Sequence, residues 1–166
     1  ADKDIAHELL YEYEVVLVDI GQWNKNTDLA ANYKADLKGS GVPYLTILDA
    51  SGAVLANQET GALESKPAAG EANPKPGHDP AKVLAFLKAH EATPIVASSA
   101  LASALARATT EHKHVLLHFG APWCGWCHKL EAWLARPEID ALLSKDFIDL
   151  KIDTERMTGG SDIFKQ

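Results

Sequence analysis

The sequence predicts an α/β protein, because short apolar-rich runs alternate with segments in which apolar residues recur at helical spacing. The runs with the length and β-branched content of strands are 15–20, 42–49, 115–119 and 147–153. Helical spacing occurs between them, as in residues 3–14. Hydrophobic residues make up 46% of the 166 positions, which is enough to build a core. We therefore expect one domain, or one domain with a large extension.

The first half of the chain is predicted to contain helices, a hairpin and a long loop. We expect, in order, a helix over 3–14, a strand over 15–20, a polar-faced helix over 26–38 closed by Gly39-Ser40-Gly41, and a strand over 42–49. Ala50-Ser51-Gly52 predicts a tight turn into a hairpin partner that begins at Ala53. Residues 61–78 are rich in Gly, Pro, Ala and charged residues, which is typical of an exposed loop. Asp79 predicts the N-cap of a helix that has Pro80 in its first turn and runs to about His90.

The second half begins after a short linker at 91–94. Ser98 or Ser99 is expected to cap a helix, and the strand 115–119 should then lead directly to the two cysteines. A helix beginning at Cys127 is expected to bend or break at Pro137. The strand 147–153 follows, and the remaining residues predict a loop and the start of one more helix.

The charge and hydropathy of the chain exclude several classes of function. A net charge of −7 and the lack of any Lys/Arg cluster argue against a nucleic-acid-binding surface. No apolar run approaches the roughly 20 residues that are needed to span a bilayer. The first residues also lack the basic-then-apolar pattern of a signal peptide.

Cys124 and Cys127 are the only cysteines, and they predict redox chemistry. Two thiols separated by two residues at the start of a helix can close and reopen a small disulfide, and a helix N-terminus favours the thiolate on the first sulfur. We expect Cys124 to attack a substrate disulfide and Cys127 to resolve the resulting mixed disulfide. Gly125 and Trp126 would set the geometry of the loop. No other cysteine is present to build a disulfide framework, so the pair is predicted to be reactive, and it would suit the cytosol or the bacterial periplasm.

Three other interpretations of this segment remain open. Cys-Gly-Trp-Cys-His matches the attachment signature of c-type haem, with His128 as proximal ligand and Met157 as a possible distal one. The two thiols together with His112, His114 or His128 could instead form a zinc site. The third alternative is a binding or assembly module without catalytic activity.

An internal repeat relates the two halves of the chain. A shift of 134 residues aligns two segments that each run from a helix into a strand that ends at an aspartate. The aligned pairs are Ile5 with Ile139, Leu9 with Leu143, Tyr13 with Phe147, Val16 with Leu150, Val18 with Ile152 and Asp19 with Asp153. The repeat favours a tandem origin for the two halves.

The segment from Val115 through Trp123-Cys124-Gly-Trp-Cys127 and into a helix resembles the active-site half of the thioredoxin superfamily. Ala-Pro-Trp-Cys-Gly-x-Cys is also similar to the form found in protein disulfide isomerase domains. Residues 15–90 resemble the other half of the same fold, and the part from Val15 through Gly52 is especially similar to bacterial disulfide-isomerase-like proteins. The resemblance implies a thioredoxin-like α/β fold with a central mixed sheet flanked by helices.

The order of the two halves is the reverse of that in the family. Residues 1–90 would form the C-terminal half of a module, 91–97 a linker, and 98–166 the N-terminal half that carries the cysteines. The chain would then be either part of a tandem array or a circular permutant. Each half alone would leave an open sheet edge, so we expect the halves to complement each other within one chain or in a domain-swapped homodimer.

The resemblance also implies roles for residues around the cysteines. Trp123 would flank the nucleophile on an apolar docking surface, unless it is a core tryptophan. Pro43 would be the cis-proline whose backbone pairs with the substrate strand, and Val42 would tune the nucleophile; the alternative is a trans proline at a strand edge. His118 stands where the family places a buried acid, so it would either take the proton of Cys127 or be a hydrogen-bonded core histidine.

The function implied by the resemblance is thiol–disulfide exchange on protein substrates. Electrons would pass through the dithiol itself, so no cofactor is required, and a redox partner protein would regenerate it. The resemblance to disulfide isomerases favours isomerase or oxidase activity in a periplasmic or secreted setting over the cytoplasm, whereas the low cysteine content fits a reductase equally well.

Overall fold

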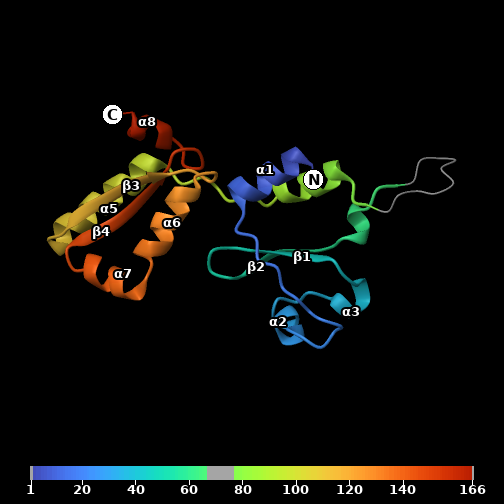
Figure 1. Ribbon diagram of the computed structural model, residues 1–166. Coiled ribbons are helices and arrows are strands. Elements are labelled where there is room, and N and C mark those ends of the chain that lie inside the picture. Colours follow the sequence, from blue (N-terminus) through green and yellow to red (C-terminus); the bar gives the residue numbers. More distant parts are fainter. Residues whose placement is uncertain (1, 67–76, 166) are drawn as a thin grey trace. The chain divides into compact units, whose positions relative to one another are not determined.

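The computed structural model describes residues 2–66 and 77–165, and it contains two compact units (Figure 1). The first unit ends at Ala92 and the second begins at Thr93. Part of the loop predicted over 61–78 lies outside the described residues. The prediction that each unit is half of a thioredoxin module remains a prediction.

The first unit consists of helices and one hairpin. Its elements are α1 (Lys3–Glu12), α2 (Thr27–Asn32), α3 (Leu37–Ser40), β1 (Tyr44–Leu48), β2 (Val54–Glu59), a 3-10 helix (Gly61–Leu63) and α4 (Pro80–Lys88). The predicted hairpin is confirmed, because β1 and β2 pair in antiparallel fashion from Tyr44 opposite Glu59 to Leu48 opposite Val54. The predicted cap of α4 is also confirmed, since the Asp79 carboxylate accepts a hydrogen bond from the Ala81 N–H.

Two predicted elements of this unit are wrong. The predicted strand 15–20 joins no sheet, and the side chains of residues 15–18 lie in solvent, with Leu17 92% exposed. A strand requires a neighbouring strand for its backbone hydrogen bonds, and none of the described segments pairs with this one. The predicted helix 26–38 is two short helices, because Lys34 adopts a left-handed backbone conformation (φ 58°) and the Asp36 carboxylate caps the second helix by accepting the Gly39 N–H.

Helices α1 and α4 lie against each other, and a buried carboxyl group faces this contact (Figure 1). Glu8 of α1 is only 6% exposed. Burial raises the pKa of Glu8 above its usual value, and a side-chain hydrogen bond with Glu91 and the negative charge of that residue raise it further. The folded protein therefore binds this proton more tightly than the unfolded chain does.

We expect Glu8 to make the first unit less stable as the pH rises above about 4.5, the pKa of the unfolded chain. Its contribution is fully present below that pH and is lost as the pH passes through the raised pKa, because a charge must then be buried. Urea titrations at several pH values measure the free energy of unfolding of both proteins. The value for Glu8→Gln minus the value for the wild type should increase as the pH rises from 4 to 7. Glu14→Gln, which removes an exposed carboxylate from the same unit, is the control and should show no such trend.

The second unit is a parallel strand pair with helices on both faces. Its elements are α5 (Ala97–Glu111), β3 (His114–Gly120), α6 (Gly125–Leu134), α7 (Pro137–Leu143), β4 (Phe147–Asp153) and α8 (Gly160–Phe164). The strands predicted at 115–119 and 147–153 are confirmed, and they pair in register from His114 opposite Phe147 to Gly120 opposite Asp153. The prediction of an α/β fold is thus confirmed. Among the described residues the strands form two separate two-stranded sheets instead of one central sheet, because each pair is formed within one unit.

Helix boundaries in the second unit differ from the predictions. Helix α5 begins at Ala97 without a side-chain cap, so the predicted cap at Ser98 or Ser99 is wrong. Ala97 is fully buried, and its N–H donates to the Thr158 carbonyl. The packing of Ala97 and this backbone hydrogen bond therefore set the start of the helix. The predicted break at Pro137, by contrast, is confirmed, because α6 ends at Leu134 and Pro137 is the first residue of α7, a position that tolerates proline since its missing N–H would have no partner there.

The two faces of the β3–β4 pair have different character. Side chains alternate along a strand, and directly paired residues of β3 and β4 share a face. On one face Ile148, Val115 and Leu150 pack with Ala104 and Ala108 of α5. The opposite face is mostly polar and carries His114, Leu116, His118 and Gly120 of β3 together with Phe147, Asp149, Lys151 and Asp153 of β4. Helix α6 contacts β3, and Glu131 of α6 pairs with Lys151, so α6 covers this polar face.

The aspartates at the ends of the two repeat copies make the same local contact. Asp153 accepts the N–H of the residue two positions later, Glu155, and Asp19 accepts that of Gly21 in the same way. The copies differ in burial, because Ile152 is fully buried whereas its counterpart Val18 is 43% exposed. The burial differs because β3 and α5 pack against β4, whereas no described strand pairs with residues 15–20.

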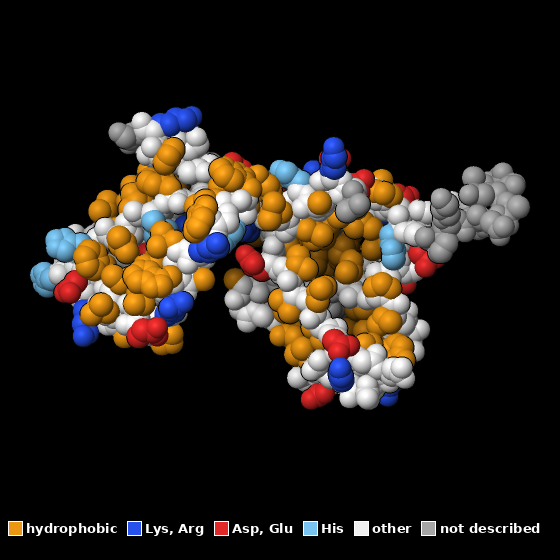
Figure 2. Space-filling view, in the orientation of Figure 1, with side chains coloured by type: hydrophobic (Ala, Val, Ile, Leu, Met, Phe, Trp, Pro, Cys, Tyr) orange, Lys and Arg blue, Asp and Glu red, His pale blue; other side chains and the backbone are white. Residues whose placement is uncertain are grey.

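Large hydrophobic side chains reach the surface of both units, as Figure 2 shows in orange. Over half of the side chain is exposed at Val16, Leu17, Trp123 and Trp126. Within the described part of the chain, no helix is both long enough and apolar enough to cross a membrane.

Candidate active site

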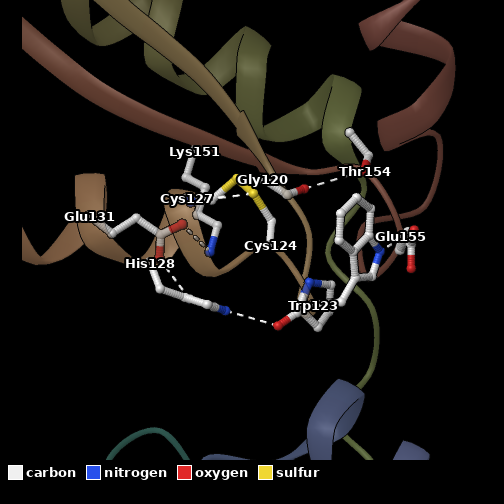
Figure 3. The surroundings of a disulfide bond; sticks show 10 residues. Gly120, Trp123, Cys124, Cys127, His128, Glu131, Lys151, Thr154 and Glu155 are labelled. Carbon is white, nitrogen blue, oxygen red and sulfur yellow. Dashed lines mark hydrogen bonds and ion pairs between the residues drawn. A yellow bond between two sulfur atoms is a disulfide. The ribbon is translucent and has the colours of Figure 1, made fainter.

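The two cysteines form a disulfide at the start of α6, directly after β3 (Figure 3). Their Cα atoms are 5.2 Å apart, and both residues are partly exposed. Cys124 is the N-cap of α6, and its Sγ accepts the Cys127 N–H at 3.3 Å. The helix therefore begins at Gly125, two residues earlier than predicted. Free N–H groups and the positive end of the helix dipole thus meet at Cys124, where they favour a thiolate when the pair is reduced.

Two exposed tryptophans flank the disulfide. Trp123 is 65% exposed, so it is not a core tryptophan, and its indole N–H donates to Glu155 Oε1 at 2.8 Å. Trp126 is 79% exposed, and Lys129 Nζ lies 4.2 Å from the centre of its ring. These contacts restrain the rings of two residues that directly precede Cys124 and Cys127 in the chain, and they leave much of each ring in solvent.

A chain of polar contacts runs beside the disulfide (Figure 3). His128 Nε2 is 2.8 Å from the Pro122 carbonyl, and its Nδ1 is 3.7 Å from Glu131 Oε2. The other oxygen of that carboxylate, Oε1, is 2.8 Å from Lys151 Nζ. Sequence reasoning missed Glu131 and Lys151. The available signal was the position of Glu131, which follows Cys127 by four residues and so lies on the same helix face.

Gly120 leaves the space into which these groups fit. A Cβ on Gly120 would lie 3.0 Å from Lys151 Cε, 3.3 Å from Glu131 Oε1 and 3.6 Å from Cys127 Cβ. The Lys151 side chain, the Glu131 carboxylate and Cys127 therefore converge on the last residue of β3.

Comparison with known proteins agrees with this geometry. The sequence profile of a family described as thioredoxin-like matches residues 96–165, the segment that carries the cysteines. Residues 96–165 form a thioredoxin-like domain. This supports a function in thiol–disulfide exchange in general. No curated protein and no solved structure gives a significant match to the chain. The profile match begins at residue 96, so the resemblance of residues 15–90 to the other half of the fold, and the permuted or swapped arrangement, remain predictions.

His118 lies on the polar face of β3 within the thioredoxin-like domain, two residues before Gly120. Its side chain is 12% exposed, and its Nε2 is 3.2 Å from Asp149 Oδ1. The two groups are within ion-pair distance but are poorly aligned, so the nitrogen has no hydrogen-bond partner of good geometry. His118 is thus largely buried and faces a carboxylate on the neighbouring strand, as a core histidine would. Its proposed redox role remains a prediction.

Val42 and Pro43 belong to the first unit and precede β1. The peptide bond between them is cis, and Thr60 Oγ1 donates to the Pro43 carbonyl at 2.8 Å. Val42 is 54% exposed. The thioredoxin-like domain carries the cysteines in the other unit, so the role of this pair beside a substrate remains a prediction.

The alternative ligands of a metal site do not cluster. Across residues 2–66 and 77–165, no three side chains of His, Cys, Asp or Glu lie close enough together to hold a metal ion. His112 ends α5 in a left-handed conformation, and His114 begins β3, where its ring lies 6.0 Å from that of Phe147. His128 makes the contacts to Pro122 and Glu131 described above.

Proposed function

We propose that this protein catalyses thiol–disulfide exchange on protein substrates through Cys124 and Cys127. The observation that carries the proposal is the disulfide itself, placed with Cys124 as N-cap of α6 and flanked by exposed tryptophans. A helix N-terminus favours thiolate, which is the form of cysteine that attacks disulfides. The location of the pair in a thioredoxin-like domain gives independent support.

The proposed reaction has two steps. The Cys124 thiolate attacks one sulfur of a substrate disulfide, forming a mixed disulfide and releasing the other substrate sulfur as a thiolate that takes up a proton. The Cys127 thiolate then attacks Cys124 Sγ, forms the Cys124–Cys127 disulfide and releases the second substrate thiol. The substrate gains two electrons and the protein dithiol loses them, and the reverse sequence oxidises a substrate dithiol. The dithiol is the only redox group that these steps require.

The exposed rings of Trp123 and Trp126 suit a protein substrate. Each offers a large apolar surface beside the sulfurs, and one polar contact fixes each ring, so little side-chain freedom is lost on binding. An unfolded or partly folded chain that exposes a disulfide together with apolar residues would match this surface. We propose such chains as substrates and a second thiol protein as the redox partner.

The reduction potential of the Cys124–Cys127 pair tests the function and its direction. We expect a single two-electron transition when the protein is equilibrated in graded thiol–disulfide buffers and its free thiols are counted by alkylation and mass. A potential near about −270 mV would support a reductase, and one between about −180 and −120 mV an isomerase or oxidase. If no reversible disulfide formed at any potential, the oxidoreductase proposal would fail, and a binding or assembly module without activity would replace it.

A further inference from the structure

We propose that Glu131 is the proton acceptor for the Cys127 thiol, with Lys151 and His128 as the residues that position its carboxylate. The inference deepens the proposed function and rests on it. Resolution of the mixed disulfide requires Cys127 to lose its proton, and Cys127 lies one helical turn beyond the N-cap, where it gains less from the helix N-terminus than Cys124 does. A base near Cys127 would therefore speed this step.

The space around Gly120 places the carboxylate beside the resolving cysteine. Glu131 Oε1 and Cys127 Cβ lie 3.3 and 3.6 Å from the point where a Gly120 Cβ would be. Both residues project from the same face of α6 toward the end of β3, and Figure 3 shows Glu131 and Lys151 on the Cys127 side of the disulfide. A side chain at residue 120 would fill the space that these groups share.

The carboxylate also lacks a well-aligned donor in the oxidised protein. Glu131 Oε1 is buried, and although Lys151 Nζ is 2.8 Å away, the contact does not have the geometry of a hydrogen bond. A buried oxygen without an aligned donor is costly to maintain. Reduction of the disulfide creates a new donor, the Cys127 S–H, on the residue whose Cβ shares the space beside Gly120 with this oxygen.

Lys151 and His128 hold the carboxylate from two sides. Lys151 pairs with Oε1 across the polar face of β4, and His128 faces Oε2 from the same helix. Since His128 Nε2 lies 2.8 Å from the Pro122 carbonyl, this nitrogen must carry the hydrogen that is donated there. Nδ1 of the neutral ring then cannot donate, and only the imidazolium donates to Glu131. The same ring ties the carboxylate to the loop that precedes Cys124.

Other titratable or charged groups lie on α6 and on the strands and helix beside it. They are His118 on β3, Asp149 and Asp153 on β4, Lys129 on α6 itself, and Glu138 and Asp140 on α7. Of these, His118 and Asp149 pair with each other, and Asp153 accepts two backbone N–H groups. Glu131 is the carboxylate that shares the space beside Gly120 with Cys127.

In the proposed step Glu131 takes the proton from Cys127 Sγ, and the resulting thiolate attacks Cys124 Sγ. The bond between Cys124 and the substrate sulfur breaks as the intramolecular disulfide forms. The substrate sulfur leaves as a thiolate with the electron pair of the broken bond. The proton on Glu131 then passes to this thiolate or to solvent, which restores the carboxylate.

Ellman's reagent separates the two steps in the full-length protein. The reduced protein should release one thionitrobenzoate when Cys124 attacks the reagent and a second when Cys127 resolves the mixed disulfide. We expect Glu131→Gln to leave the first phase within about twofold of the wild type and to slow the second by about 100-fold near pH 7. The second phase should recover as the pH rises toward about 8.5, where free thiols ionise without a base.

Three further variants make the result decisive. Glu131→Asp, which keeps the acid, should restore part of the second-phase rate, and Glu138→Gln, which removes an exposed carboxylate from α7, should behave as the wild type. A second phase in Glu131→Gln with the wild-type rate and pH profile would overturn the inference. The inference would also be overturned if the pH profile of the second phase changed in His118→Ala but not in Glu131→Gln. If the wild type shows no second phase, the proposed function itself fails, which is a different outcome. Circular dichroism of each variant checks that it is folded.

Discussion

Replacement of Cys124 by serine is expected to abolish thiol–disulfide exchange, lowering the rate of insulin reduction by about 1,000-fold or more, to the uncatalysed background. A serine hydroxyl does not ionise near neutral pH and forms no disulfide, so neither the attack nor the mixed disulfide is possible. The fold should survive, because the substitution replaces one partly exposed atom at the N-cap of α6, a position that serine favours.

The Cys127→Ser variant is the matched control for this prediction. It keeps the attacking thiol but cannot resolve the intermediate, so it should accumulate a mixed disulfide with the substrate that is detectable by mass. The chain contains no other cysteine, so any such adduct must form at Cys124. If Cys124→Ser formed the trapped adduct and Cys127→Ser did not, the assignment of nucleophile and resolving residue would be reversed.

Replacement of Ile152 by alanine is expected to destabilise the second unit by about 2–5 kcal/mol. Ile152 is fully buried and is the last but one residue of β4, so its truncation removes apolar contacts and leaves a cavity beside the β3–β4 strand pair. A loss of this size is a large part of the 5–15 kcal/mol that holds a typical domain together. Urea unfolding followed by tryptophan fluorescence should report it, since Trp123, Trp126 and Trp133 all lie in this unit.

Ile95→Ala provides the comparison at an exposed position. Ile95 is 60% exposed and is held in the structure by its backbone carbonyl, which accepts the Thr158 N–H. Truncation of its side chain should cost less than about 1 kcal/mol, because little apolar surface returns to water. Equal losses for the two variants would contradict the placement of Ile152 in the core.

Features that depend on neighbouring residues in the chain were predictable. Strand β4 has the predicted bounds, and Asp79 caps α4 as expected from an aspartate before a proline in the first turn. The hairpin between β1 and β2 follows from the Ala50-Ser51-Gly52 turn, and Gly52 adopts the positive φ that favours glycine. In each case the decisive interaction spans only a few residues.

Predictions failed where the outcome depends on a distant partner. Residues 15–20 have the apolar content of a strand, yet they join no sheet, because no described strand lies beside them. Helix α5 begins at Ala97 because this residue packs in the core and pairs with Thr158, which is 61 residues away in the chain. Such contacts leave no periodic signal near the residue that they affect.

The sequence by itself determined the α/β class, the two-residue spacing of Cys124 and Cys127, and the helix that starts beside them. Only the tertiary structure decided which groups surround Cys127. The register of β3 against β4 brings Lys151 next to Gly120, and α6 lays Glu131 over the same point. Lys151 lies 20 residues from Glu131 in the chain, and neither belongs to a recognisable motif. Their pairing follows from strand register and helix packing, which are long-range properties that no local pattern encodes.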